Sequence, residues 1–352
     1  MTILVLQAIA GFVLLYFGAE WLVNGSSKLA LKLGVAPLII GLTVVAFGTS
    51  SPELFVCLDA NLSNEDPNEG GGIVLGTIVG SNVFNIALIL AVGALIRPIH
   101  VSKQIVTREM PILLVATGLL LWFLQNQELS RVEGGILFGG LIAFLVLSGI
   151  TSIKQMQEKR GGAPEILEDF DPEAAKEMPV WKALVLIVLG LLGLAYGSDL
   201  LVSSATEIAK AFNVSAAIIS FTLIAFGSSV PELATVVVAS IRKEGDIITG
   251  NVIGSNIFNT LAVLGIVALV KPVVYDSAQL TTIEPYYMAG LTVLLFPFLL
   301  TRKTLARWEG LVLLLACVGF ACILFQKVQK QIAAVPPEAA AISEPAAPSW
   351  ST

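Results

Sequence analysis

The sequence "TVVAFGTSSPEL" at residues 43–54 places a proline and a glutamate inside an apolar run, and it returns as "TLIAFGSSVPEL" at residues 222–233. The two stretches share eight of twelve residues. An acid near the middle of a membrane helix costs about 2.5–3.5 kcal/mol on insertion scales. A proline there opens the helix, because it lacks an N–H group and its ring clashes with the preceding turn. Because both copies contain the proline and the glutamate in spite of these costs, the two residues are expected to have a function.

A second motif is also present twice. "GTIVGSNVFN" at residues 76–85 matches "GNVIGSNIFN" at residues 250–259 in six of ten residues. The offset between the copies is 179 residues at the proline motifs and 174 at the second motif, so the first copy has five more residues between its motifs. Two motifs in the same order in each half indicate an internal duplication.

The composition is that of an integral membrane protein. Of 352 residues, 56% are hydrophobic and 13% are charged, and the mean hydropathy is +0.87. The N-terminus lacks a basic region and a cleavage site, so it is predicted to be a first span and not a signal peptide. Ten runs are long enough to cross a bilayer, at about 3–24, 36–60, 73–96, 110–125, 132–153, 181–205, 214–241, 247–270, 284–301 and 307–326.

These runs predict four segments. They are a first five-helix repeat at 1–153, a charged cytoplasmic linker at 154–178, a second inverted five-helix repeat at 179–326 and a disordered tail at 327–352. The linker contains eleven charged residues, and the tail is rich in alanine and proline.

An odd number of spans in each copy means that the second copy enters the membrane from the opposite side. One face then receives 15 of the 20 Lys and Arg residues. By the positive-inside rule this face is cytoplasmic, which places both termini outside. The predicted fold class is therefore all-α integral membrane, with ten transmembrane helices as two inverted five-helix repeats. This architecture is frequent in secondary transporters, and the expected location is the cell (inner or plasma) membrane.

The polar residues of the two motifs predict an oxygen-lined cation site. Glu53 and Glu232 lie well inside their spans, at matching positions of the two copies. Helical spacing places further oxygen donors beside them: Thr49, Ser50, Ser228 and Ser229 in the proline motifs, and Ser81, Asn85, Ser255 and Asn259 in the second motifs. One histidine and three cysteines leave no His- or Cys-rich metal site. The cation is therefore expected to be hard, such as sodium, calcium or magnesium.

The paired motifs resemble the alpha-repeats of the cation/calcium exchanger superfamily, and they are closest to those of prokaryotic sodium/calcium exchangers. The resemblance covers both halves. It implies a secondary-active antiporter that exchanges sodium for calcium by alternating access and is electrogenic, with sodium and calcium as transported ions and no cofactor. It also implies the roles of individual residues. Glu53 and Glu232 are then the principal ligands, and Thr49, Ser50, Ser228 and Ser229 lie beside them. The backbone carbonyls of Ala46 and Ala225 face outer sodium sites, which Ser81 and Ser255 complete. Asn85 and Asn259 face the centre of the site.

Several alternatives remain open. The exchanger could couple calcium, or another divalent cation, to protons or potassium, although Asn259 stands where potassium-dependent members have aspartate. A channel and an intramembrane hydrolase are further readings, but the inverted duplication favours alternating access, and no serine–histidine or paired-aspartate motif is present in the spans. We therefore expect no enzymatic activity. The partners expected are the ions and the lipid bilayer, with no nucleic acid and no obligate protein partner.

Overall fold

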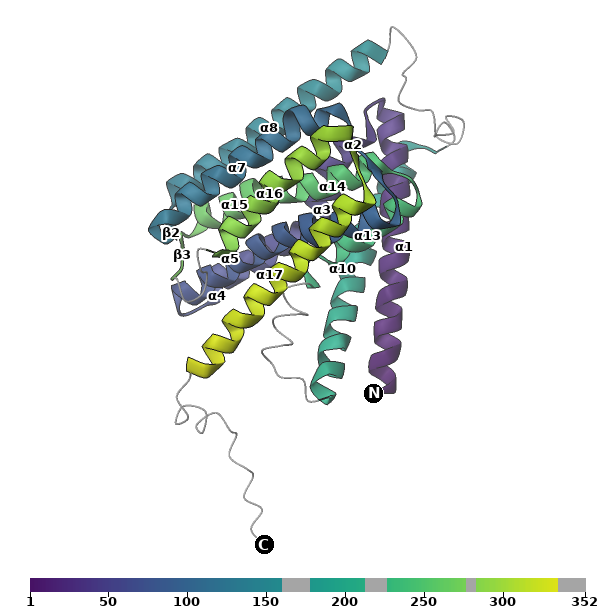
Figure 1. The fold of residues 1–352 in the computed structure, drawn as a ribbon. Coiled ribbons are helices and arrows are strands. Elements are labelled where there is room, and N and C mark those ends of the chain that lie inside the picture. The colour runs from purple at the N-terminus through teal and green to yellow at the C-terminus, as the bar shows by residue number, and fades with distance from the viewer. Residues whose placement is uncertain (160–177, 213–226, 277–282, 335–352) are drawn as a thin grey trace.

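The computed structural model describes residues 1–159, 178–212, 227–276 and 283–334, and these are almost entirely helical (Figure 1). Nine helical stretches in those ranges are long and apolar enough to cross a membrane. The shorter apolar helix Val230–Ile241 forms the end of the seventh predicted span, and residues 213–226, where that span begins, lie outside the described ranges. The predicted all-α membrane fold is confirmed.

The elements of the two repeats follow the same order. The first repeat comprises α1 (Thr2–Leu33), α2 (Pro37–Ile40), η1 (Gly41–Val45), α3 (Ala46–Thr49), α4 (Ser51–Ser63), α5 (Pro67–Phe84), η2 (Asn85–Ile89), α6 (Leu90–Ile96), β1 (Ile99–His100), η3 (Ile105–Glu109), α7 (Met110–Phe123), η4 (Leu124–Asn126), β2 (Glu128–Leu129) and α8 (Arg131–Lys159). The second repeat comprises α10 (Val180–Ala211), α13 (Val230–Ile241), α14 (Gly245–Phe258), η6 (Asn259–Val263), α15 (Leu264–Val270), β3 (Val273–Val274), α16 (Ile283–Arg302), β4 (Thr304–Leu305) and α17 (Arg307–Ala334).

Several helices are longer than the apolar runs that predicted them. α1 continues to Leu33, past the expected end at residue 24, and α10 continues to Ala211. α17 continues to Ala334, so the helix extends into the segment expected to be a disordered tail from residue 327. The reason is that Gln, Lys and Ala are good helix formers outside the membrane as well as inside it. Hydropathy finds the apolar part of a helix, whereas the helix itself ends at a cap such as Gly34, which has φ of 73°.

The two repeats interlock through reciprocal contacts. α6 of the first repeat packs against α17 of the second, and the corresponding α15 packs against α8 of the first. Two short antiparallel strand pairs, which the sequence analysis did not predict, also join the repeats: β1 with β4, and β2 with β3. Contacts exchanged in this way are those expected of two inverted copies related by a two-fold axis.

α1 and α10 lie side by side at one edge of the molecule and run steeply across the direction of α7, α8 and α16 (Figure 1). Glycines let their backbones touch. A Cβ atom at Gly18 would lie 2.8 Å from the backbone nitrogen of Leu194, and one at Gly190 would lie 2.7 Å from that of Leu22. Because real Cβ atoms essentially never approach so closely, larger residues at these positions would separate the helices.

Candidate ion-binding site

Two broken helices position the glutamates. The helical backbone is interrupted at Ser50, with φ −88° and ψ 2°, and at Ser229, with φ −90° and ψ 2°. Pro52 and Pro231 then occupy the first turns of α4 and α13, where the missing N–H group costs no hydrogen bond. The breaks predicted from the prolines are confirmed, and the two copies have nearly the same geometry.

Each glutamate lies in the first turn of the helix that follows its break, and both are fully buried. The unpaired N–H groups and the macrodipole at a helix N-terminus favour a negative charge there. This contribution offsets part of the cost of burying Glu53 and Glu232. The sequence predicts both acids in the middle of a span, but hydropathy does not indicate that each lies in the first turn of a new helix.

The two carboxylates, one from each repeat, lie near each other. The charge of Glu53 acts directly on Glu232. The side chain of Ser228 lies beside Glu53, and that of Thr49 lies beside Glu232, so each acid is flanked by a hydroxyl from the other copy. Residues of the two proline motifs thus lie close together in this structure.

Ser81 connects the two motifs in the centre of the cluster. Its hydroxyl donates to Glu53 Oε1 at 3.5 Å and accepts hydrogen bonds from Ser229 Oγ at 3.3 Å and from Asn259 Nδ2 at 3.1 Å. Ser81, Asn85, Ser255 and Asn259 are all buried. Ser81 and Asn259, one from each copy, are thus linked to Glu53 through hydrogen bonds.

The cluster contains more oxygen atoms than it has donors. Seven buried oxygens of this cluster have no hydrogen-bond partner among the described residues: Ser50 Oγ, Glu53 Oε2, Asn85 Oδ1, both carboxylate oxygens of Glu232, Ser255 Oγ and Asn259 Oδ1. Burying oxygens without a partner is costly, and burying an unpaired carboxylate costs most. Cations would satisfy these atoms, and calcium takes 6–8 oxygen ligands. The residues present therefore fit the hard cations predicted from the sequence.

The oxygens that could bind a cation belong to two carboxylates and otherwise to neutral groups. In the part of the chain that the structure describes, no three His, Cys, Asp or Glu side chains come together as a metal cluster. With only two carboxylates the site carries at most two negative charges, so it binds a cation less tightly than a cluster of three or more acids would.

Two predicted backbone ligands stand apart. The carbonyl oxygen of Ala46 accepts a hydrogen bond from the backbone nitrogen of Ser50 at 3.0 Å. It is therefore engaged within its own helix in this conformation. Ala225 lies outside the described residues.

Three further asparagines belong to the cluster. Thr49 Oγ1 donates to Asn251 Oδ1 at 3.2 Å, and Asn251 was missed because the corresponding residue of the first copy is Thr77. Asn82 and Asn256, one position off the predicted face, bond to Asn259 and Asn85 across the repeats. Their presence in both copies was the only signal in the sequence.

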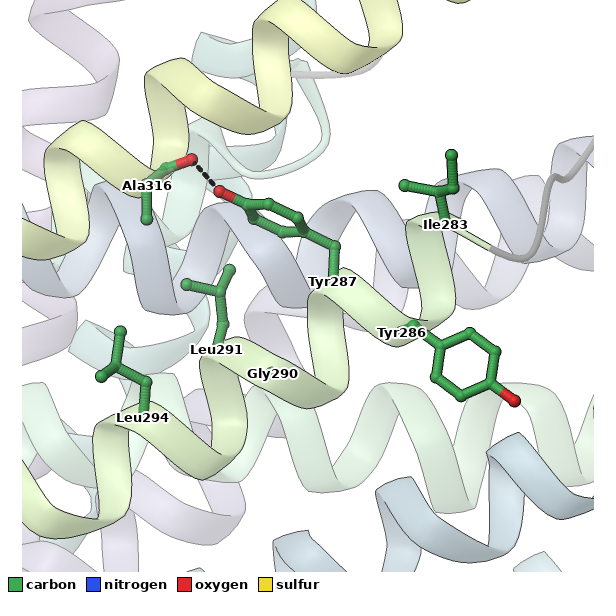
Figure 2. A pocket seen from close by; sticks show the side chains of 7 residues that line it. All are labelled: Ile283, Tyr286, Tyr287, Gly290, Leu291, Leu294 and Ala316. Atoms are coloured by element: carbon green, nitrogen blue, oxygen red, sulfur yellow. Dashed lines mark hydrogen bonds between the residues drawn. The ribbon is translucent and has the colours of Figure 1, made fainter.

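A separate cavity of about 550 Å³ opens between α16 and α17 (Figure 2). Its lining is almost wholly apolar, and the hydroxyl of Tyr287 is used in a 2.6 Å hydrogen bond to the carbonyl of Ala316. Without a carboxylate it offers a cation no charge, so it is not a candidate for the ion site.

A known protein family matches most of this chain. The sodium/calcium exchanger protein family matches residues 3–149 and 182–326, which together include both broken helices and both asparagine motifs. The chain belongs to this family. It is a multi-pass membrane antiporter and not an enzyme.

Similar proteins cover nearly the whole chain. The sodium/calcium exchanger MaX1 of Methanosarcina acetivorans is 31% identical over 92% of this chain and 99% of its own length. The inner membrane protein YrbG of Escherichia coli is 34% identical over 87% of this chain and 91% of its own. The solved structure of the sodium-calcium exchanger NCX_Mj, soaked with Na⁺ and Sr²⁺, has a TM-score of 0.73 at 29% identity, and the match covers 90% of this chain and 97% of that one.

Proposed function

We propose that this chain exchanges sodium for calcium across the membrane by alternating access, and that both ions use the cluster around Glu53 and Glu232. The observation that carries the proposal is the pair of buried carboxylates, which come from inverted copies and are surrounded by oxygens without partners. Such a site at the interface of inverted repeats can be exposed to either side in turn. The printed names of the relatives support the same ions.

The ligands of this site are proposed residue by residue. Glu53 and Glu232 are the principal calcium and sodium ligands, since only they supply charge. Hydroxyl, amide and backbone oxygens complete the coordination: those of Thr49, Ser50, Ser81, Asn85, Ser228, Ser229, Ser255 and Asn259, with the carbonyls of Ala46 and Ala225 toward outer sodium sites. Asn251 holds the hydroxyl of Thr49 in place.

The charge of the site sets the stoichiometry that we propose. With Asn85 and Asn259 neutral, the ionised site carries two negative charges. One calcium or two sodium ions neutralise it, and a third sodium leaves one positive charge. Exchange of three sodium ions for one calcium therefore moves one net charge, worth about 2.3 kcal/mol per 100 mV. An inside-negative potential would drive sodium in and calcium out.

Flux in proteoliposomes tests this function. Vesicles loaded with sodium should take up calcium, and an inside-positive potential should accelerate the uptake because net positive charge leaves. Uptake driven only by a proton or potassium gradient would instead establish the alternative coupling. Uptake that follows sodium but ignores the voltage would reject the three-to-one exchange.

We also propose the orientation in the cell (inner or plasma) membrane. The face with 15 of the 20 Lys and Arg residues is cytoplasmic, the linker at 154–178 lies on that side, and both termini lie outside. The same division gives repeats at 1–153 and 179–326. A single cysteine placed in the linker, in a variant without Cys57, Cys317 and Cys322, should react with an impermeant maleimide only from the cytoplasmic side. Labelling from the outside would reverse the orientation.

A further inference from the structure

An asparagine that binds a cation must be held the right way round. Its side chain carries a carbonyl oxygen on one side and an NH₂ group on the other, and only the oxygen can be a ligand. Asn85 and Asn259 correspond in the two copies, and each has a buried Oδ1 atom without a partner among the described residues. The contacts that fix the orientation of each amide therefore determine whether its oxygen is directed toward an ion.

The amide of Asn259 is held by two hydrogen bonds. Its Nδ2 atom donates to Ser81 Oγ at 3.1 Å and to Asn82 Oδ1 at 3.1 Å. The Ser81 hydroxyl already donates to Glu53, so it can only accept from Asn259. Both N–H groups of Asn259 are thus used, and its oxygen is the atom left for an ion.

Asn82 is itself fixed by a neighbour that cannot donate. Its Nδ2 atom contacts Met288 Sδ at 3.5 Å and donates to Thr260 Oγ1 at 3.2 Å. A thioether has no hydrogen to donate, so only the NH₂ side of Asn82 can face it. The oxygen of Asn82 must then face Asn259. In this way Met288 fixes the orientation of Asn82, and Asn82 fixes that of Asn259 in the ion site.

The corresponding amides of the other copy have no such support. Asn85 Nδ2 donates to Asn256 Oδ1 at 3.1 Å. The counterpart of Ser81 is Ser255, whose hydroxyl has no partner in the described part of the chain, and the same is true of Asn256 Nδ2. At the same offset of 174 residues, the residues that correspond to Thr260 and Met288 are Ile86 and Leu114, which offer no acceptor.

We propose that Asn82 is a positioning residue that fixes the carbonyl oxygen of Asn259 toward the transported ions, with Met288 and Thr260 as its anchors. Asn256 plays the same part for Asn85 without an anchor, so the amide of Asn85 can turn. The two copies therefore contribute one fixed and one adjustable amide ligand. This inference rests on the proposed ion site.

The test is calcium transport by the variant Thr260→Val/Met288→Leu, which removes both anchors and keeps the side-chain volumes. The half-saturating calcium concentration should rise about 10-fold with little change in maximum rate, because a turned amide weakens binding. In an Asn259→Ala background the same two changes should have no further effect. An unchanged half-saturating concentration, or an equal rise without Asn259, would overturn the role of Asn82.

Ile86→Thr is the matched change in the other copy. Because Ile86 corresponds to Thr260, a threonine there is expected to supply an acceptor for Asn256 and to lower the half-saturating calcium concentration about 3-fold. An unchanged or higher value would overturn the assignment of Asn85 as the adjustable ligand. Glu232→Gln serves as the control for the site: if transport survives this change, the proposed ion site fails, whatever the asparagine variants do.

Discussion

Glu53 and Glu232 have the same burial, the same position in a first helical turn and the same break before them, but their surroundings differ. The carbonyl of Gly227, which precedes the break in this copy, accepts a 2.9 Å hydrogen bond from Ser198 of α10. In the other copy the residue corresponding to Ser198 is Ala19, which cannot donate to Gly48. Both copies thus have a buried glutamate after a helix break, whereas, among the described residues, only the second copy has a side-chain hydrogen bond from its first helix to the glycine before the break.

This difference bears on alternating access. In a transporter built from inverted repeats, the two copies exchange conformations between the inward-open and outward-open states. If the copies were identical, the two states would have equal free energies apart from the asymmetry of the membrane. A contact present in only one copy therefore contributes to the preference for one state.

The largest expected effect concerns the two glutamates, which occupy equivalent positions in the two copies. Glu53→Gln and Glu232→Gln each remove one charge from a buried pair and keep the side-chain shape, so each should lower calcium transport about 100-fold or more. The measurement is sodium-driven calcium uptake in proteoliposomes at matched protein content, with exposed Glu69→Gln as the control. Loss in one variant with full transport in the other would show that the acids are not equivalent.

The next prediction concerns the α1–α10 contact. Gly18→Ala and Gly190→Ala each place a Cβ atom within 3.0 Å of the opposite backbone and should destabilise the protein by about 1–3 kcal/mol. Thermal unfolding in detergent measures this effect. Gly139→Ala is the matched control, since a Cβ atom there meets no described atom within 4 Å. Equal melting temperatures for all three variants would mean that the close approach is unimportant.

A smaller effect is expected where the copies differ. Ser198→Ala removes the hydrogen bond to Gly227 and should shift the equilibrium between the two states about 5-fold, from about 1 kcal/mol. Ala19→Ser adds the bond to the other copy and should shift it in the opposite direction. The readout is the ratio of half-saturating calcium concentrations on the two faces of oriented proteoliposomes. Shifts of the same sign would contradict the comparison.

The smallest effect belongs to an ion pair between α1 and the loop after α13. Glu20 forms an ion pair with Arg242, and Ser27 donates to Glu244 at 3.0 Å, whereas the counterpart Asp199 is exposed and has no ion pair in the described ranges. Burial raises the pKa of Glu244. Since the Glu20–Arg242 pair is partly exposed, Arg242→Gln should change the same ratio only about 2-fold, and high salt should remove the difference. A large effect that persists in high salt would mean that Arg242 acts in another way.

Much of the fold could be read from local features of the chain. Membrane spans appear as apolar runs because the bilayer requires about 20 such residues. The repeat of "TVVAFGTSSPEL" and "GTIVGSNVFN" revealed the duplication, and the odd number of spans then required inversion. The helix ends were less certain, since Leu33 and Ala334 end helices that continue beyond the apolar region.

The composition of the candidate site was also predictable, but its geometry was not. Helical spacing places Thr49 and Ser50 on the same face as Glu53, and Ser228 and Ser229 on that of Glu232. It cannot say that Ser228 flanks Glu53 while Thr49 flanks Glu232, because those contacts join residues far apart in the chain.

The sequence by itself determined that this protein crosses the membrane in two inverted copies, each with one buried acid after a proline-broken helix, because hydropathy, proline chemistry and repetition are local properties. Only the tertiary structure decided which oxygens remain without partners and which way each amide faces. Hydrogen bonds such as those of Asn82 to Thr260 and Met288 form between copies. Their directions follow from which neighbour can donate, and the packing of the two repeats brings those neighbours together.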